Sequence, residues 1–479
     1  MNQTTIFDVL YPKYKITKPI RLIELFAGYG SQYLALKYLG ANVKHYKICE
    51  WAIKSIQAYK DIHFTDDNID YSKKYKKDEL INILYSLGIS QNYNEPMTFQ
   101  QISRLGETQL RKIYNNIKTT RNLVNIQQVS GEYLEIKETD KYEYIMTYSF
   151  PCQDLSLAGK RKGMSDTSTR SGMLWEVERI LTECKELGTL PQILLMENVP
   201  QVHSMESMPD FHKWQVRLEE LGYKSYWQDL IATDYGIPQT RNRCFMISIL
   251  GDYSYTFPEP IPLKLKLKDL LEDNVDEKYY LSDKMIKCFT RESNDNKFPR
   301  NERFEQALKL TNEKGIAGTI TTAAGNRATD NFILIKNNNS KGYLEATVGD
   351  GIDIYSRMEH HRGTVQKGKA QTLTTQCDRG VVIGTNQYAK SDKFMQGRDR
   401  LQLGKDTSDT LQTTPKEGIV NSNLRIRKLT PLECFRLMGV KDEDYYKVAK
   451  NQSNSSLYHL AGDSIVVNVL MSIFKEMIK

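Results

Sequence analysis

Short apolar runs that end at turns recur through the first half of the chain. Residues 19–25 read as a buried strand that runs into a glycine turn, and residues 43–49 as a second strand of alternating character. A helix between them is expected from about Ser31. Further strand-like runs at 144–149 and 192–196 lead directly into Cys152 and Glu197, two residues with reactive side chains. This alternation predicts an α/β fold with an open sheet, in which the loops after the strand ends carry the function.

Two parts of the chain depart from this alternation. Residues 71–121 open with a basic run and continue with apolar residues at helical spacing, which predicts a small helical insertion. After about residue 250 the chain becomes polar and rich in glycine, threonine and asparagine, which indicates a separate domain of short strands. A threonine-rich echo in that part, typical of repeated β units, recurs at 319–322, 372–375 and 410–414.

The composition is that of a soluble globular protein. The 479 residues are 40% hydrophobic and 26% charged, enough for two or three domains. A run of about 18 apolar residues is lacking, so we expect no membrane role. The N-terminus has no basic stretch followed by an apolar block, which predicts a cytoplasmic location. The seven cysteines are scattered without a Cys-x-x-Cys pair, which predicts reduced thiols and no metal site.

The net charge of +7 is compatible with a polyanion partner. Its distribution is uneven, because residues 362–400 contain eight basic and three acidic side chains. That stretch is suited to following the phosphates of a nucleic acid, but it is equally typical of a solvated loop. Charge alone leaves both interpretations open.

The glycine turn after the first strand is a candidate cofactor site. Gly28 and Gly30 allow the backbone to turn sharply and to approach a ligand at a helix N-terminus, which suits nucleotide-like cofactors. Glu50 follows the second strand and can accept hydrogen bonds from ribose hydroxyls. Phe26 and Trp51 either sandwich an adenine or are ordinary core residues.

Cys152 lies in the loop after the third strand-like run and is the candidate nucleophile. A free cysteine is most often a buried small hydrophobe. Here Pro151 precedes it, and the basic residues Lys160, Arg161 and Lys162 follow in the same loop, giving a positive field that favours the thiolate. The same cations are equally suited to DNA phosphates. A nucleophilic thiol beside a carried methyl group is what methylation of cytosine at C5 requires, because something must first add to C6.

Glu197 and a pair of arginines complete the candidate chemistry. Glu197 follows an apolar strand, so its carboxyl group would lie in a partly apolar site where its pKa rises. A protonated glutamate can donate to N3 of cytosine. Arg241 and Arg243 are two positions apart on a strand-like run, so both would point to one face and reach oxygens of a base or phosphate. Taken singly, such a pair is usually surface charge.

Together and in this order, these residues resemble the DNA (cytosine-5)-methyltransferases over nearly the whole chain. The ordered motifs are Phe26-Ala27-Gly28-Tyr29-Gly30, Glu50-Trp51, Pro151-Cys152-Gln153, Gly172-Met173-Leu174, Glu197-Asn198-Val199, Gln239-Thr240-Arg241-Asn242-Arg243, the run 427–437, and Gly462-Asp463-Ser464. Two departures are visible: Asp463 stands where the family often has Asn, and Asn125 where it often has Asp. Both residues keep a side-chain oxygen that accepts hydrogen bonds.

The resemblance implies a Rossmann-like catalytic domain and a β-rich target-recognition domain. Residues 1–250 and about 455–479 would form the first, with the helical insertion 71–121, and residues 251–454 the second. S-adenosylmethionine is the implied methyl donor, and a C-terminal helix at about 465–478 would pack beside its site. The implied catalytic residues are Cys152, Glu197, Arg241 and Arg243. The implied cofactor-binding residues are Phe26, Ala27, Gly28, Gly30, Glu50, Trp51, Asn125, Ile126, Pro151, Leu174 and Ser464. The implied DNA-contacting residues are Gln153, Ser156, Lys160, Arg161 and Lys162.

The implied reaction acts on a cytosine flipped out of double-stranded DNA. Cys152 adds to C6, Glu197 protonates or hydrogen-bonds N3, C5 takes the methyl group, and a base then removes the C5 proton. A monomer is expected, either with a cognate restriction endonuclease or in an orphan or phage-protection setting. The function of the insertion and the recognised DNA sequence stay open.

Two other functions share this scaffold. An RNA methyltransferase is disfavoured by the long segment between Arg243 and Arg427, which suits reading a duplex through its major groove. A binding protein without activity is disfavoured because Cys152, Glu197 and both arginines are present. An adenine N6 methyltransferase would need an Asp/Asn-Pro-Pro-aromatic turn, which the sequence lacks.

Overall fold

The chain divides into two compact units. The computed structural model describes residues 11–67, 69–150, 173–280 and 424–478, and the shorter stretches 333–336, 343–346, 350–353, 364–370, 372–373 and 379–384. The first unit comprises Met1–Ile237, Arg241–Lys264 and Phe435–Lys479, and the second Pro238–Thr240 and Leu265–Cys434.

The division falls at other positions than the sequence predicts. Residues 251–264 and 435–454 belong to the first unit, whereas the predicted boundaries were 250 and 454. Polar contacts explain the second difference. The Tyr38 hydroxyl donates to Asp444 at 2.6 Å, and the Asn451 amide donates to Asp61 at 3.0 Å. These bonds fasten residues 442–451 to helices near the N-terminus of the chain.

The first unit is built on a six-stranded sheet in the order β2-β1-β3-β4-β6-β5. Its strands are β1 Ile20–Leu25, β2 Val43–Cys49, β3 Glu143–Tyr148, β4 Ile193–Asn198, β5 Tyr223–Ile231 and β6 Asn242–Leu250. The first four pair in parallel, and β6 runs antiparallel to both of its neighbours. All six residues of β3 and of β4 are buried, as expected for central strands covered on both faces.

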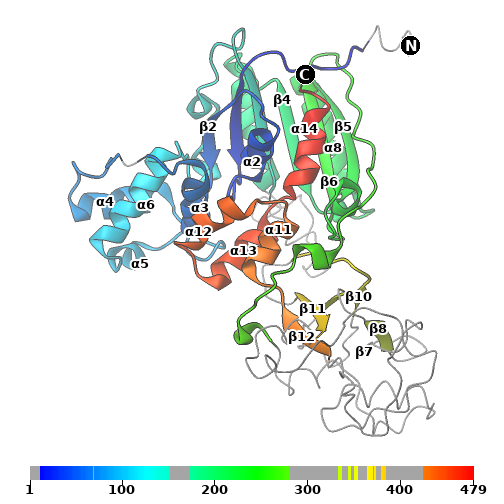
Figure 1. The fold of residues 1–479 in the computed structure, drawn as a ribbon. Helices are drawn as coiled ribbons and strands as arrows, with labels where there is room; N and C mark the ends of the chain where they lie inside the picture. Colours follow the sequence, from blue (N-terminus) through cyan, green and yellow to red (C-terminus); the bar gives the residue numbers. More distant parts are fainter. Residues whose placement is uncertain are drawn as a thin grey trace, which may run out of the picture. The chain divides into compact units, whose positions relative to one another are not determined.

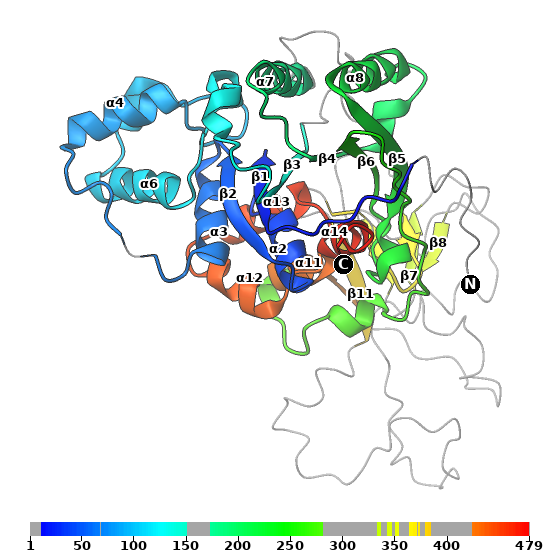
Figure 2. The same ribbon diagram turned by 90° about the horizontal axis from the view of Figure 1, so that it is seen from above.

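Helices cover both faces of this sheet (Figures 1 and 2). Helices α7 and α8 lie on one face, and α2, α3 and α14 on the other. A core of aliphatic and aromatic residues from β1, β3, β4, α7 and α8 fills the first of these layers. The helices of the described residues are α2 Ser31–Tyr38, α3 Ile53–His63, α4 Lys77–Leu87, α5 Phe99–Ser103, α6 Glu107–Thr119, α7 Leu174–Glu186, α8 Met208–Leu221, α11 Pro431–Leu437, α12 Asp442–Ala449, α13 Asn454–Asp463 and α14 Val467–Lys475. The arrangement is the α/β, Rossmann-like fold that the sequence predicts.

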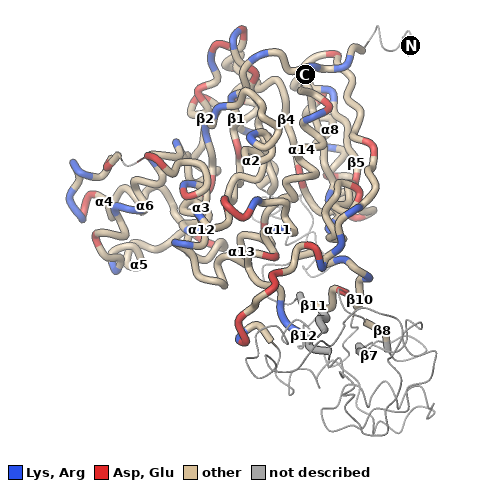
Figure 3. Tube along the Cα trace, viewed as in Figure 1, with Lys and Arg blue, Asp and Glu red and all other residues tan. Residues whose placement is uncertain are grey.

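Residues 71–121 contain helices α4, α5 and α6, which enclose a core of their own. Leu80, Leu84, Leu110 and Ile113 belong to it, and Trp51 packs partly buried against it. Figure 3 shows basic and acidic segments interspersed over α4 and the loop before it, so the opening lysine run has acidic neighbours. The chain then returns beside β2, where the Leu123 N–H donates to the Ile48 carbonyl at 2.8 Å.

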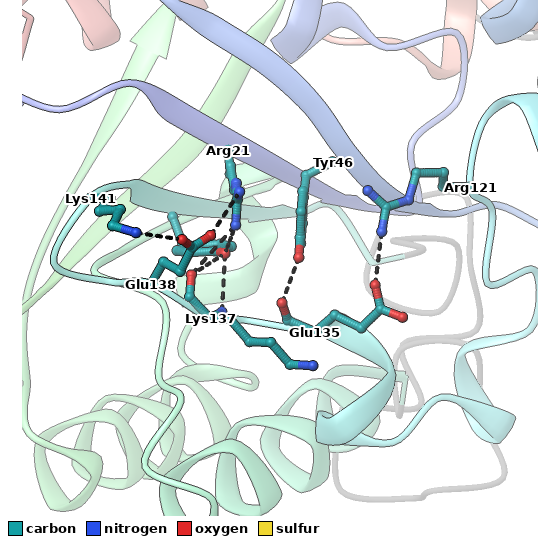
Figure 4. A network of polar contacts seen from close by, with 8 residues as sticks. Arg21, Tyr46, Arg121, Glu135, Lys137, Glu138 and Lys141 are labelled. Atoms are coloured by element: carbon teal, nitrogen blue, oxygen red, sulfur yellow. Dashed lines mark hydrogen bonds and ion pairs between the residues drawn. The ribbon is translucent and has the colours of Figure 1, made fainter.

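A polar network fastens the segment that follows this return to the sheet (Figure 4). The Arg21 guanidinium donates to the Tyr144 hydroxyl at 2.6 Å and lies over the Tyr142 ring at 3.5 Å. Glu135 pairs with Arg121 at 2.8 Å, and its carbonyl accepts from the Tyr46 hydroxyl at 2.5 Å. The connection from the insertion into β3 is therefore held at several points.

The described strands of the second unit form a sheet in the order β10-β9-β11-β12 and a hairpin of β7 and β8. Their bounds are β7 Ile333–Lys336, β8 Tyr343–Ala346, β9 Gly351–Asp353, β10 Val365–Gln366, β11 Arg379–Gly384 and β12 Leu424–Lys428. Arg427 in β12 forms two hydrogen bonds, of 2.7 and 2.6 Å, with the carboxylate of Glu433. Both side chains are almost fully buried, so this bidentate ion pair anchors the end of β12.

The C-terminal segment Asn454–Lys475 is, among the described residues, long and apolar enough to cross a membrane by length and composition. Polar residues such as Asp463 interrupt this segment, so the sequence pattern predicts no unbroken apolar run there. However, 72% of its most apolar window is buried inside the protein, as in the core helix of a globular domain. The segment also breaks between α13 and α14, at Ser464 to Val466, so each helix is short.

Candidate active site

The glycine turn after β1 has a conformation that few residues adopt. Gly28 and Gly30 have φ angles of 56° and 83°, and Phe26 also has a positive φ of 58°. A Cβ at Gly30 would lie 2.5 Å from Nε2 of His63, so only glycine fits there. A Cβ at Gly28 would meet no atom within 4 Å. Gly30 is thus required by packing, whereas Gly28 faces open space beside the turn.

Glu50 connects the end of β2 to this turn. One oxygen of its carboxyl group accepts from the Gly28 N–H at 2.9 Å, and the other accepts from the Ala52 N–H at 2.8 Å. Burial raises the pKa of Glu50 to about 7, and the nearby Asp463 carboxylate adds to the rise. The backbone of Glu50 is held in turn by Asn122, which accepts from its N–H at 3.0 Å and donates to its carbonyl at 2.8 Å.

The aromatic and apolar residues predicted to hold the cofactor lie in different packing layers. Phe26 packs partly buried against the core between the sheet and α7, whereas Trp51 packs against the core of the insertion. Ile126 and Leu174 are buried in the former core. Asn125 caps the short 3-10 helix Ile126–Gln128, where its side-chain oxygen accepts from the Gln127 N–H at 3.1 Å.

Glu197 is the second-last residue of β4 and does not follow the strand, because β6 pairs with β4 as far as Asn198. Its carboxyl oxygen is 3.1 Å from Nε of Arg243, and the two side chains are 9% and 17% exposed. Burial raises the pKa of Glu197, while the Arg243 and Arg241 guanidiniums oppose that rise. The carboxyl group thus keeps its proton to higher pH than an ordinary glutamate.

Arg241 precedes β6 and has a different partner from Arg243. Its guanidinium donates to the Ser464 carbonyl at 2.8 Å, and the Ser464 hydroxyl donates to the Ala461 carbonyl at 3.0 Å. The loop between α13 and α14 is therefore fastened beside the start of β6. Since the Asp463 carboxylate raises the pKa of both Glu50 and Glu197, the two ends of the site share one electrostatic environment.

The sequence does not predict the roles of Asn198 and Asn122 in this arrangement, and it predicts Asp463 only as a hydrogen-bond acceptor. Asn198 donates to the Phe150 carbonyl at 3.0 Å, so it holds the chain two residues before Cys152. Asn198 belongs to the Glu197-Asn198-Val199 motif, in which the sequence predicts a chemical role only for Glu197. Asn122 holds Glu50, and Asp463 influences both carboxyl groups. For Asn122 the local pattern gave no signal, since its partner is 72 positions away.

The predicted residues of the loop after β3 lie outside the described residues. They are Pro151, Cys152, Gln153, Ser156, Lys160, Arg161 and Lys162. The cysteines that the structure does describe, Cys49, Cys184, Cys244 and Cys434, are all buried. Burial raises the pKa of Cys184 to about 11 and raises that of Cys49 and Cys244 as well, so these three are poor thiolates at neutral pH.

Within the described residues, one cluster has side chains of metal-binding type. His203, Asp229 and Cys244 place their ligand atoms within 4.8 Å of one another. The imidazole of His203 lies 2.9 Å from the Asp229 carboxylate. Because burial raises the pKa of Cys244, its thiol resists the deprotonation that metal binding needs.

Comparison with known proteins shows the family of the chain. The class is that of the α/β, Rossmann-like proteins, here with a buried carboxyl group at the glycine turn and a buried glutamate paired with arginine at the end of β4. The family model described as C-5 cytosine-specific DNA methylase matches residues 85–479. The chain belongs to this family, and its activity is that of a DNA (cytosine-5)-methyltransferase.

Relatives of known name align over much of the chain. It is 31% identical over 469 residues to the type II methyltransferase M2.ScrFI of Lactococcus lactis subsp. cremoris, covering 96% of this chain and 99% of that protein. It is 37% identical over 273 residues to the orphan methyltransferase M.SssI of Spiroplasma monobiae, covering 56% and 68%. The solved structure of the Entamoeba histolytica methyltransferase EhMeth aligns with a TM-score of 0.48 at 14% identity, covering 96% and 98%.

Proposed function

We propose that this enzyme methylates a cytosine within a specific sequence of double-stranded DNA, after the base has been flipped out of the duplex and bonded covalently to Cys152. The observation that carries the proposal is the Glu197–Arg243 pair at the end of β4. A buried glutamate whose pKa is raised, held at 3.1 Å by a guanidinium, is suited to donate a proton or hydrogen bond to N3 of cytosine. A flipped base can reach such a buried group, whereas a stacked base cannot.

Enzymes of this family depend on S-adenosylmethionine, and we assign its site to the edge formed by β1 and β2. The residues present fit the cofactor. Gly28 leaves open space at the turn, and each oxygen of Glu50 accepts one backbone N–H and retains a further lone pair for a ribose hydroxyl. We assign Asp463, the last residue of α13, and Ser464, which follows it, to the other end of the cofactor site. When bound, the cofactor supplies the methyl group.

The side chains of the enzyme activate the base in this proposal. The thiolate of Cys152 forms a bond to C6, and the electrons of the C5–C6 double bond move toward C5. Glu197 stabilises the resulting charge through N3, and Arg243 holds the Glu197 carboxyl group in place. After methylation a base removes the proton from C5, the double bond re-forms, and the thiolate of Cys152 leaves. The loop after β3 supplies Gln153, Ser156 and Lys160–Lys162 to the DNA.

The biological setting belongs to the proposal as well. The named relatives include a type II methyltransferase and an orphan methyltransferase, so protection of host or phage DNA is the role we assign. A cognate restriction endonuclease would then share the recognition sequence. We expect the enzyme to act as a monomer, and we assign the choice of sequence to the second unit.

Base-resolution mapping of 5-methylcytosine tests the proposal. The chain is expressed in a bacterial host that has no cytosine methylation of its own. We expect methylation confined to one short motif, its loss in Cys152→Ala, a large fall in its rate in Glu197→Gln, and its retention in Cys184→Ala, which removes a buried thiol with a raised pKa. Unmethylated DNA with soluble wild-type protein, or full methylation by Cys152→Ala, would contradict the proposal.

A further inference from the structure

The insertion reaches the cofactor edge of the sheet through its central loop. The Ser90 N–H donates to the Trp51 carbonyl at 2.8 Å, and the Ile53 N–H donates to the Ser90 carbonyl at 2.9 Å. Ser90 therefore pairs, as a strand would, with the residues that immediately follow Glu50. The loop after Ser90 is fixed relative to that carboxyl group.

Internal hydrogen bonds give this loop one shape. The Asn92 side-chain oxygen accepts from the N–H groups of Asn94 at 2.9 Å and of Glu95 at 3.2 Å. The Ser90 hydroxyl donates to the Glu95 carbonyl at 2.7 Å. Tyr93 stands at the tip with a φ of 64°, a left-handed conformation that is uncommon for a tyrosine. Strained conformations of this kind are found where a side chain has a function.

The Tyr93 side chain points back toward the site. Its ring contacts the imidazole of His459 in α13, with 3.9 Å between ring centroids. Its hydroxyl is buried and makes no hydrogen bond of ordinary geometry, with the Ser55 hydroxyl as a neighbour. Burial raises the pKa of Tyr93, and the carboxylates of Glu50 and Asp463 add to the rise. The phenol therefore stays protonated, and both carboxylates are near enough to act on it electrostatically.

We propose that Tyr93, supplied by the insertion, is a cofactor-contacting residue that binds the ribose diol of S-adenosylmethionine together with Glu50. The inference rests on the proposed cofactor site at Glu50. A buried hydroxyl that makes no hydrogen bond of ordinary geometry is costly, and the Glu50 carboxyl group that acts on it can accept further hydrogen bonds. A vicinal diol satisfies both groups, because its hydroxyls donate to the carboxylate and accept from the phenol. The insertion then completes the cofactor site as well as bracing it.

Calorimetric binding of S-adenosylhomocysteine to the full-length protein tests the inference without depending on turnover. We expect Tyr93→Phe to weaken binding about fivefold, the effect of one hydrogen bond. Tyr93→Phe keeps the ring on His459, so the protein should remain folded. Tyr85→Phe is the matched control, since Tyr85 lies in the same insertion with a ring that is 51% exposed. Its affinity should equal that of the wild type.

An analogue that lacks one ribose hydroxyl identifies the contact. Against 2′-deoxy and 3′-deoxy S-adenosylhomocysteine, the difference between wild type and Tyr93→Phe should vanish for one of the two. Equal affinity of wild type and Tyr93→Phe for the parent ligand would overturn the inference, as would a loss that is the same for all three ligands. Absence of binding to the wild type would overturn the cofactor site itself, and with it this inference.

Discussion

Replacing Arg243 with glutamine should move the pH profile of the enzyme toward alkaline pH. Nε of Arg243 lies 3.1 Å from the Glu197 carboxyl group, and its side chain is 17% exposed, so solvent screens the pair little. A guanidinium this close lowers the pKa of a carboxyl group by about 1 to 3 units. Burial has already raised the pKa of Glu197 against that influence. Removing the charge should therefore raise the pKa of Glu197 further.

The assay is kcat/KM for methylation of duplex DNA as a function of pH. If protonated Glu197 assists the reaction, activity falls as pH rises through its pKa, and in Arg243→Gln this fall should move to higher pH. Glu197→Gln cannot titrate and should lack that limb. Arg217→Gln, at an exposed arginine on α8, is the control and should leave it in place. A limb absent from Glu197→Gln but unmoved in Arg243→Gln would refute the reasoning.

The same substitution changes stability in a predictable direction. The folded-state pKa of Glu197 lies above its unfolded value, so its contribution to stability is fully present at low pH and is lost as pH rises through the folded pKa. Without Arg243 the ionised carboxylate has lost its ion-pair partner. The free energy of unfolding of Arg243→Gln relative to wild type, measured in urea, should therefore fall further at alkaline than at mildly acidic pH.

Three further substitutions have expected outcomes. Gly30→Ala places a Cβ 2.5 Å from the His63 ring at a positive φ, so the free energy of unfolding should fall by about 1 to 3 kcal/mol in urea titration. Arg427→Ala leaves the Glu433 carboxylate buried without its partner and should cost about 3 to 5 kcal/mol, with Arg427→Met/Glu433→Leu less damaging than the single change. Asn122→Ala removes three hydrogen bonds around the end of β2 and should weaken S-adenosylhomocysteine binding in calorimetry about tenfold. Unchanged affinity would show that the backbone of Glu50 keeps its position without Asn122.

Local pattern was enough to predict the sheet and the turns at its edge. The apolar runs 19–25 and 43–49 correspond to β1 and β2, and the glycine turn falls where the first run ends. The end of β4 was misplaced by two residues, because its length is decided by pairing with β6, some 48 positions later along the chain. Strand ends depend on the partner strand, which a single run of side chains does not reveal.

Contacts between distant parts of the chain could not be predicted. Asn122 reaches the Glu50 backbone only because the insertion returns its chain beside β2, and Tyr93 reaches His459 from the tip of a loop 366 residues earlier in the chain. Neither residue has a distinctive neighbourhood in sequence. A side chain that bonds to a backbone group needs the right position in space, and no local sequence pattern marks it. Such partners can therefore be identified only once the fold is known.

The electrostatics of the proposed cofactor site suit a cationic ligand. Asp463 raises the pKa of Glu50 and of Glu197, which means that these carboxyl groups resist ionising together in a poorly solvated place. Arg243 relieves the repulsion at Glu197. At Glu50, whose pKa is about 7, the described contacts are with backbone N–H groups and include no cationic side chain. A sulfonium cation bound nearby would lower that pKa, so ionisation of Glu50 and binding of the methyl donor reinforce each other.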